Sequence, residues 1–169
     1  MAVENVKLLI LDVDGVLTGG EIIIDSAGQE LKHFNVHDGT GVKYLQRCGL
    51  QVALLSGRHS EPTTVRAKQL GIDIVYQGAG DKLEVLQEIM GRAGVREEEI
   101  AYMGDDLLDL PVLRRVGYPM APANARPEVR KVVEYVTDAR GGEGAVREAA
   151  EHILRGQGRW AGLVERYLR

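Results

Sequence analysis

Strand-like aliphatic segments alternate with helix-like segments along most of this chain. The strand-like segments lie at 6–11, 51–55, 73–76 and 100–103, with weaker ones near Tyr118 and Tyr135. The helix-like segments lie at 39–48, 60–71, 81–90, 106–115 and 144–154. Consecutive strands separated by helices pair as a parallel sheet whose faces the helices cover. The pattern therefore predicts an α/β fold with a Rossmann-like parallel sheet.

Length and composition fit one domain of this kind. The chain has 169 residues and a mass of 18.5 kDa, and 44% of its residues are apolar and 27% charged. These values are ordinary for a globular protein, and the chain is too short for two domains of usual size. We therefore expect a single domain over residues 1–169.

The same composition argues against several classes of partner and site. No aliphatic run approaches the roughly 20 residues of a membrane span, and Asp12 and Asp14 interrupt the first run, where a secretory signal would continue. We expect a cytoplasmic protein without a membrane partner. The net charge of −4 and the eight aromatic residues argue against a nucleic-acid partner. The single cysteine, Cys48, excludes an internal disulfide and a thiolate-rich metal site, and its helical context predicts that it is buried.

Residues 21–35 depart from the alternation of strands and helices. Three isoleucines at 22–24 precede turn-forming residues at 25–28, and apolar and polar side chains alternate over 29–35. This pattern predicts a β-hairpin, inserted over residues 18–35. An isolated hairpin is at best marginally stable in water, so we expect hairpins of different subunits to pair. The alternative is a hairpin that folds back on its own domain.

Four polar segments follow the predicted strands or begin the predicted helices. They are 12–18 (DVDGVLT), 56–58 (SGR), 81–82 (DK) and 104–109 (GDDLLD). Each segment alone has an ordinary explanation as a helix cap, a turn or a solvated charge. In open α/β sheets, however, ligands bind beyond the carboxyl ends of the strands, and we expect these segments to meet there.

Together, the four segments predict a site for a metal ion and a phosphate group. Clustered carboxylates repel one another unless a hard cation neutralises them, and Mg²⁺ prefers oxygen ligands such as carboxylates. The hydroxyl of Ser56 and the ammonium of Lys82 are suited to bind phosphate oxygens. We therefore expect Mg²⁺ as the cofactor and a phosphate ester as the substrate.

In this order, the four segments resemble the four motifs of the haloacid dehalogenase superfamily of phosphohydrolases. Within it, nearly the whole chain resembles the 3-deoxy-D-manno-octulosonate 8-phosphate phosphatases. This closer resemblance rests on 34–39 (FNVHDG), 76–78 (YQG), 104–111 (GDDLLDLP) and 140–148 (RGGEGAVRE). The resemblance implies the fold of that superfamily. Only 41 residues separate Asp14 from Ser56 and 22 separate Lys82 from Asp105, so we expect no cap domain.

The resemblance also implies roles for the acidic residues. Asp12 would be the nucleophile that forms an aspartyl phosphate, and Asp14 would be the general acid and base. Magnesium would be held by Asp12, by the backbone carbonyl of Asp14 and by Asp105. Lys82 would take part in catalysis by cancelling charge before the attack on phosphorus. The supporting residues around the metal or Lys82 would be Asp106 and Asp109.

Substrate binding is assigned to a further set of residues, namely Thr18, Ser56, Gly57, Arg58 and Arg66. Arg58 directly follows Ser56 and Gly57, and its guanidinium could hold the carboxylate of a sugar acid through two hydrogen bonds. Similar phosphatases for a nine-carbon keto-deoxy sugar acid tend to carry Glu at the position of Arg58, so Arg58 favours the eight-carbon acid. Arg66, with Arg140 and the turn at 141–142, would hold the acid or a neighbouring tail.

Several alternatives stay open at this stage. The chain could be a phosphatase for the nine-carbon acid phosphate, a noncatalytic oligomerisation or regulatory module related to sugar-acid cytidylyltransferase domains, or a phospho-acceptor signalling domain. The resemblance implies a homotetramer and a role in lipopolysaccharide synthesis. It also implies that the amphipathic C-terminal tail at 155–169 reaches a neighbouring active site, whereas the alternative is a terminal helix packed on its own core.

Overall fold

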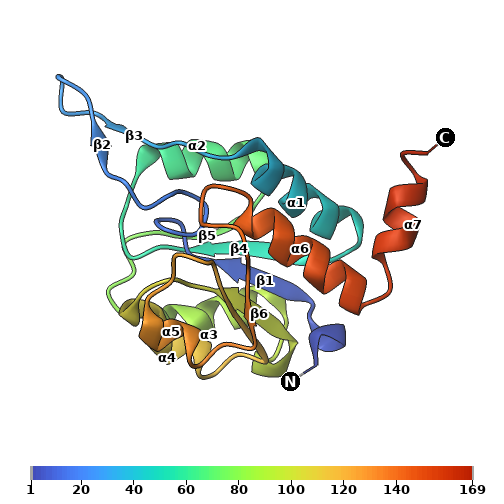
Figure 1. Cartoon of the computed structure of the whole chain (residues 1–169). Coiled ribbons are helices and arrows are strands. Elements are labelled where there is room, and N and C mark those ends of the chain that lie inside the picture. The colour runs from blue at the N-terminus through green and yellow to red at the C-terminus, as the bar shows by residue number, and fades with distance from the viewer. Residues whose placement is uncertain (1, 169) are drawn as a thin grey trace.

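A computed structural model describes residues 2–168 and contains a six-stranded sheet in the order β5-β4-β1-β6-β7-β8 (Figure 1). Every neighbouring pair in this sheet is parallel, as the alternation of strands and helices predicted. The strands of the sheet are β1 (Leu8–Leu11), β4 (Gln51–Leu55), β5 (Ile74–Tyr76), β6 (Ile100–Met103), β7 (Tyr118–Ala121) and β8 (Tyr135–Val136).

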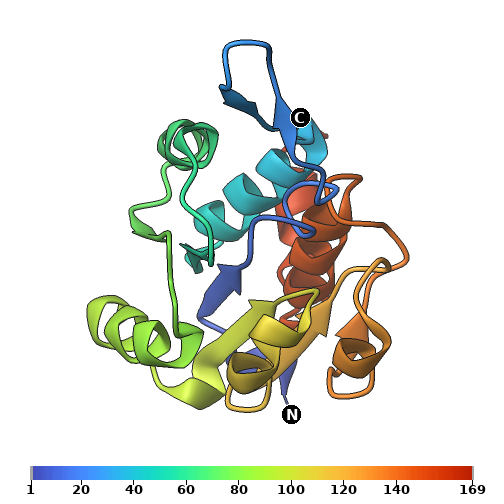
Figure 2. The same ribbon diagram turned by 90° about the vertical axis from the view of Figure 1, so that its left-hand side faces the viewer.

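Helices cover both faces of the sheet (Figures 1 and 2). One face carries α1 (Val36–Arg47), α2 (Glu61–Leu70) and α6 (Ala145–Gly156). The other face carries α3 (Lys82–Ala93), α4 (Leu110–Leu113) and α5 (Pro127–Arg130). The predicted fold class, a parallel sheet flanked by helices, is therefore confirmed.

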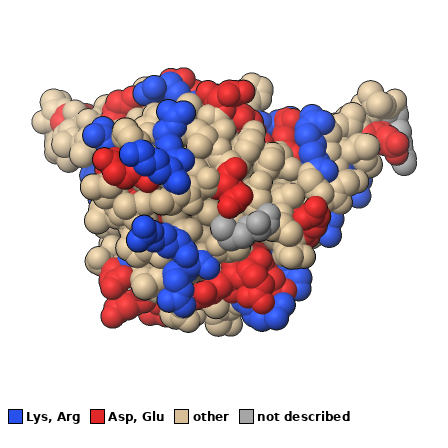
Figure 3. Space-filling view, turned by 60° about the horizontal axis from the view of Figure 1, so that its bottom comes forward, with Lys and Arg blue, Asp and Glu red and all other residues tan. Residues whose placement is uncertain are grey.

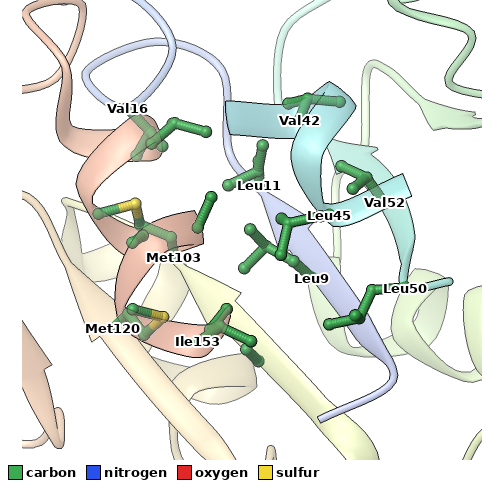
Figure 4. Close-up of a cluster of buried hydrophobic side chains, with 14 of the residues drawn as sticks. Leu9, Leu11, Val16, Val42, Leu45, Leu50, Val52, Met103, Met120 and Ile153 are labelled. Carbon is green, nitrogen blue, oxygen red and sulfur yellow. The ribbon is translucent and has the colours of Figure 1, made fainter. Parts of the chain in front are cut away.

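The central strand β1 shows how the sequence builds this arrangement. Its four residues are all buried, because successive side chains of a strand point to opposite faces and both faces are covered. Leu9 and Leu11 pack with Val42 and Leu45 of α1 and with Ile153 of α6 (Figure 4). Leu8 and Ile10 belong to the second core, which contacts α3 and α4. Strand β1 is therefore packed between two hydrophobic cores, and this packing fixes the position of the residues that follow it.

Side chains at helix starts explain two of the boundaries. The Asn35 side chain accepts a hydrogen bond from the backbone N–H of His37, so α1 begins at Val36, three residues before the predicted start. Asp81 accepts from the backbone N–H groups of Leu83 and Glu84, which places Lys82 at the first position of α3. Both helices therefore present polar residues at the edge of the sheet where the carboxyl ends of the strands lie.

The predicted helix over 106–115 is confirmed only in part. A 3-10 turn over Leu107–Asp109 and the short α4 replace it. The side chains of Asp106 and Asp109 accept hydrogen bonds from the backbone N–H groups of residues 105–107 and cap the start of this segment. Leu107 and Leu108 of the 3-10 turn are exposed rather than packed in the core. Cys48 is also less buried than predicted, because it lies at the end of α1 and is half-buried.

The predicted hairpin is present but short. Strand β2 (Ile23–Ile24) pairs antiparallel with β3 (Glu30–Leu31) in a separate sheet, and the hairpin projects from the domain at the upper left of Figure 1. The side chains of Ile22, Ile24 and Leu31 are exposed there. In this single chain, these apolar side chains of the hairpin therefore remain exposed.

The C-terminal segment forms α7 (Trp160–Glu165), which lies far from the hairpin (Figure 1). Leu163 is buried, and the ring of Trp160 meets the ring of Tyr44 edge-on at 6.0 Å. The guanidinium of Arg155, from α6, lies over the ring of Trp160 at 4.8 Å. In this chain, the segment therefore packs on α1 and α6 of its own domain.

Residues 2–168 contain no additional domain over the strand ends, in agreement with the short gaps between the motifs. None of the helices in this range is both long and apolar enough to cross a membrane. On the face drawn in Figure 3, Lys and Arg side chains lie among Asp and Glu side chains rather than in one continuous basic patch.

Candidate active site

The sheet topology brings the polar segments together. Strand β1 lies between β4 and β6, which is where the order of strands reverses and where ligands bind in open α/β sheets. Asp12 directly follows β1, Ser56 follows β4, and Asp105 lies two residues after β6. These strand ends and the start of α3 enclose a cleft of about 300 Å³. The cleft is lined by all of the predicted site residues except Thr18 and Arg66.

Three carboxyl groups converge inside the cleft. Asp12, Asp105 and Asp109 each place one oxygen so that the three oxygens lie within 4.8 Å of one another. Asp12 and Asp109 are buried and Asp105 is partly buried. Such a cluster of oxygen donors is suited to a hard divalent cation.

Asp109 differs from the other two carboxyl groups in its hydrogen bonds. One oxygen of Asp109 accepts from Lys82 at 2.7 Å and from the hydroxyl of Tyr102. The other oxygen accepts from the backbone N–H groups of Asp105 at 2.9 Å and Asp106 at 3.1 Å. Both oxygens of Asp109 are therefore already bonded, which suits an anchor for Lys82 better than a metal ligand.

Asp12 and Asp105 keep oxygens that can bind a cation. Asp12 Oδ1 accepts from the backbone N–H of Val13 at 2.8 Å and lies 3.1 Å from Lys82 Nζ. Among residues 2–168, neither Asp12 Oδ2 nor the Asp105 carboxyl group forms a hydrogen bond within the chain. Gly15 faces Asp105 so closely that a methyl group at this position would collide with the carboxyl group. The donor set of this site therefore fits Mg²⁺, which Asp12 and Asp105 could hold.

Burial and mutual repulsion change the pKa values of these groups. Burial, with a smaller contribution from Asp109 that Lys82 offsets, raises the pKa of Asp12 to about 7. Burial and the neighbouring carboxyl groups, with Asp12 foremost, raise the pKa of Asp105 to about 7. Burial alone would lower the pKa of Lys82, but Asp12 and Asp109 raise it above its ordinary value. Lys82 therefore stays charged, while Asp12 and Asp105 become fully ionised only above neutral pH or when a cation binds.

We expect Mg²⁺ to stabilise the protein more near pH 8 than near pH 6. Because the pKa values of Asp12 and Asp105 lie above their ordinary values, these groups stabilise the metal-free fold at low pH. That stability is lost as the pH rises through about 7. A divalent cation binds the ionised carboxylates, so its affinity should fall up to about tenfold per carboxylate for each pH unit below the pKa.

The measurement is the unfolding temperature with and without MgCl₂ at the two pH values. The Asp105→Asn variant should lose most of the Mg²⁺-dependent shift, whereas Asp73→Asn should keep it, because Asp73 is an exposed carboxylate at the opposite edge of the sheet. Equal Mg²⁺ shifts at both pH values would contradict the assignment of Asp12 and Asp105 as ligands.

The second motif forms the opposite wall of the cleft. Ser56 is buried, and its hydroxyl oxygen accepts from the backbone N–H of Arg58 at 3.3 Å. Gly57 and the Arg58 side chain also line the cleft. The Arg58 side chain is 44% exposed, and its guanidinium lies 3.1 Å from Glu30 and 3.5 Å from Asp14. The guanidinium therefore lies within reach of both the cleft and the hairpin.

Asp14 makes ion pairs that sequence reasoning missed. Its Oδ1 accepts from Lys32, which follows strand β3 of the hairpin. Lys32 Nζ also lies 3.3 Å from Glu30 Oε1. The only sequence signal for these two residues is the alternating pattern of the hairpin, which does not show that the hairpin folds toward Asp14.

Two predicted substrate-binding residues lie outside the cleft. Thr18 is buried, and its hydroxyl bonds within its own loop, accepting from the backbone N–H of Gly20 at 3.2 Å. Arg66 lies on α2 and bonds Gln69 at 3.3 Å. It lines a larger hollow of about 690 Å³ between α2 and the hairpin. In a single chain, neither residue is placed to touch a substrate in the cleft.

The turn at 141–142 supports the first motif rather than the cleft. Gly142 donates its backbone N–H to Val16 at 3.1 Å, and a side chain at Gly141 would collide with the backbone of Gly15. Asn124, which sequence reasoning missed, bridges the two loops by donating to the Gly15 carbonyl at 2.9 Å and accepting from the Gly141 N–H at 2.6 Å. Arg140 is exposed and does not line the cleft.

Comparisons with known proteins agree with this geometry. The family model described as haloacid dehalogenase-like hydrolase matches residues 60–148. The 3-deoxy-D-manno-octulosonate 8-phosphate phosphatase KdsC of Escherichia coli K12 is 42% identical over 156 residues, which cover 92% of this chain and 83% of the relative. This chain belongs to the haloacid dehalogenase-like hydrolase family.

Solved structures of this hydrolase family match almost the whole chain. The 3-deoxy-D-manno-octulosonate 8-phosphate phosphatase of Moraxella catarrhalis, in complex with a magnesium ion, a phosphate ion and a KDO molecule, matches with a TM-score of 0.95 and 39% identity, covering 98% of this chain and 95% of its own. The cobalt-bound deoxy-D-mannose-octulosonate 8-phosphate phosphatase of Haemophilus influenzae matches with a TM-score of 0.94 and 40% identity, covering 99% of both chains. The haloacid dehalogenase-like fold and the predicted absence of a cap domain are thus confirmed.

Proposed function

We propose that this protein is a magnesium-dependent phosphatase that hydrolyses 3-deoxy-D-manno-octulosonate 8-phosphate to the free sugar acid and inorganic phosphate. The observation that carries the proposal is the meeting of Asp12, Lys82 and Asp105 in one cleft at the carboxyl ends of the strands. The relatives that are named for this activity match at about 40% identity over nearly the whole chain and support the choice of substrate.

In the first half of the proposed reaction, the unbonded oxygen of Asp12 attacks phosphorus. A bond forms between this oxygen and phosphorus, and the bond from phosphorus to the sugar oxygen breaks. Lys82, held by Asp109 at 2.7 Å and 3.1 Å from Asp12, offsets the negative charge of the phosphate during the attack. Bound Mg²⁺ would supply further charge neutralisation at the phosphate oxygens. Asp14 gives its proton to the departing sugar oxygen.

In the second half, the aspartyl phosphate on Asp12 is hydrolysed. Asp14, now a carboxylate, takes a proton from a water molecule that attacks phosphorus. The bond between phosphorus and Asp12 breaks, inorganic phosphate leaves, and Asp14 carries a proton again. Ser56, Gly57 and the start of α3 line the part of the cleft where the phosphate oxygens would be held.

Arg58 supports an acidic sugar as the leaving group. Its guanidinium lies at the rim of the cleft, close to Glu30 and Asp14, so it already binds carboxylates in this structure. The carboxylate of a bound sugar acid would take the same kind of partner, with two parallel hydrogen bonds. Both sugar acids carry a carboxylate, so the preference for the eight-carbon acid rests on the family resemblance, in which phosphatases for the nine-carbon acid tend to carry Glu at the position of Arg58.

We expect phosphate release to be fastest with the eight-carbon acid phosphate in a panel of sugar phosphates. The panel includes the nine-carbon acid phosphate and neutral sugar phosphates, each assayed with Mg²⁺ and with a chelator. The Arg58→Glu variant should lower kcat/KM for the eight-carbon acid by roughly 100-fold, because a hydrogen-bonded charge pair is lost and a repulsive pair is created. The same change should lower kcat/KM for neutral sugar phosphates by less, because these substrates have no carboxylate for Arg58 to bind.

The outcome of the panel separates this proposal from its alternatives. Faster hydrolysis of the nine-carbon acid phosphate would reverse the choice of substrate. Complete inactivity with all phosphates would favour a noncatalytic oligomerisation module. A stable phosphoprotein that releases no phosphate would favour a phospho-acceptor domain, in which Asp14 has no task as acid and base.

The proposal includes a homotetramer that forms through the hairpins. Its support is the exposure of Ile22, Ile24 and Leu31 on a hairpin that projects from the domain. A solution mass near that of one 18.5 kDa chain would contradict it. The family resemblance also supports a role in lipopolysaccharide synthesis in the cytoplasm, which is proposed with the activity.

A further inference from the structure

Lys32 carries a buried side-chain charge outside the metal and phosphate centre that the mechanism does not yet use. It follows β3 at the base of the projecting hairpin, yet its side chain is only 1% exposed. Its Nζ donates to Asp14 Oδ1 and lies 3.3 Å from Glu30 Oε1. A buried ammonium is stable only when it is paired, and here its two partners are a residue of the hairpin and a residue of the catalytic loop.

The contacts of Asp14 distinguish its two oxygens. Oδ1 is bound by Lys32, which lines the hollow beside the hairpin and not the cleft. Oδ2 lies 3.5 Å from Arg58 Nη1, and the Arg58 side chain is at the rim of the cleft. The ion pair with Lys32 therefore fixes the carboxyl group from behind and leaves Oδ2 on the side where a substrate would bind.

Without Lys32, no other buried cation among residues 2–168 would hold Asp14. Glu30 and Asp14 would then share Arg58 alone. The Arg58 side chain is 44% exposed, and its guanidinium lies closer to Glu30, at 3.1 Å, than to Asp14, at 3.5 Å. Two carboxylates that compete for one cation repel each other, and the Asp14 side chain would turn away from the position set by the ion pair. A displacement of about 1 Å is enough to slow proton transfer strongly.

We propose that Lys32 is a positioning residue that orients the Asp14 carboxyl group toward the leaving oxygen and links that orientation to the hairpin. This inference rests on the proposed phosphatase function. It assigns a role in proton transfer to a residue that touches neither the phosphate nor the metal. The proton still moves between Asp14 and the sugar oxygen in the first step, and between water and Asp14 in the second.

The test compares two leaving groups. The alkoxide of a sugar needs a proton as it leaves, whereas p-nitrophenolate leaves well without one. We expect Lys32→Met to lower the single-turnover rate with the sugar-acid phosphate by about 10- to 100-fold. The rate of the first turnover of p-nitrophenyl phosphate should change by less than about threefold, and only its later turnovers, which need Asp14 as a base, should slow. Lys32→Arg should restore most of the loss, because it keeps a cation at this place.

Controls separate positioning from misfolding. The burst amplitude of p-nitrophenolate counts the active sites, so every rate is corrected for any unfolded fraction. The matched variant is His33→Met, which changes the neighbouring exposed side chain of the same hairpin and should leave both rates unchanged. An equal loss with both leaving groups, or a normal rate with the sugar-acid phosphate in Lys32→Met, would overturn the inference. Failure of the unaltered protein to hydrolyse either phosphate would instead contradict the proposed function.

Discussion

The Asp12→Asn variant is expected to lose at least about 10⁴-fold in kcat, since removal of a nucleophile costs an enzyme roughly this much or more. An amide has nearly the size of a carboxyl group but is not a nucleophile toward phosphorus. In the cleft, Asp12 Oδ1 lies 3.1 Å from Lys82 Nζ. Its other oxygen, Oδ2, forms no hydrogen bond within the described chain. Phosphate release at saturating Mg²⁺ measures the loss, and no acid-stable phosphoprotein should be trapped from the variant.

Stability measurements show whether such a loss is chemical or structural. Burial raises the pKa of Asp12 to about 7, so its ionised form is unfavourable in the metal-free protein at higher pH. We therefore expect the metal-free variant to unfold near pH 8 at a temperature no lower than that of the unaltered protein. The matched variant Asp73→Asn alters an exposed carboxylate and should keep full activity. Turnover by Asp12→Asn within about tenfold of the original rate would remove Asp12 from its assigned role.

The sequence allowed much of this site to be predicted because its parts lie at strand ends. In a parallel sheet, the carboxyl ends of neighbouring strands share one edge, so identifying β1, β4 and β6 as strands was enough to bring Asp12, Ser56 and Asp105 together. The start of α3 could also be predicted from the sequence, since Asp81 caps the helix and Lys82 follows it.

The parts that could not be predicted depend on contacts between distant segments. Lys32 and Asp14 are 18 positions apart, and the alternating pattern of the hairpin indicates its strands but not the direction in which it folds. The helix expected over 106–115 was confirmed only in part, for a different reason. Apolar spacing cannot show that Asp109 turns inward to bind Lys82 and two backbone N–H groups, or that the segment begins with a capped 3-10 turn.

The contact between Asp109 and Lys82 makes Lys82 the second position where we expect a substitution to have a large effect. The Lys82→Met variant should lower kcat by about 10³-fold, because the phosphate would approach Asp12 and Asp109 without a protein cation between them. It should also lower the free energy of unfolding by about 3–5 kcal/mol, because it leaves buried carboxylates without their partner. The Lys82 side chain is only 5% exposed, so water cannot replace that partner fully.

A second substitution distinguishes the two effects. In Lys82→Met/Asp109→Asn the uncompensated charge of Asp109 is gone, so the unfolding temperature should recover by several degrees. The activity should stay low, because Asp12 still faces the phosphate without the ammonium. The exposed Lys68→Met change is the matched control and should shift the free energy of unfolding by less than about 0.5 kcal/mol. Recovery of activity together with stability would mean that Lys82 only balances Asp109, and that the charge needed for the attack on phosphorus comes from elsewhere in the cleft.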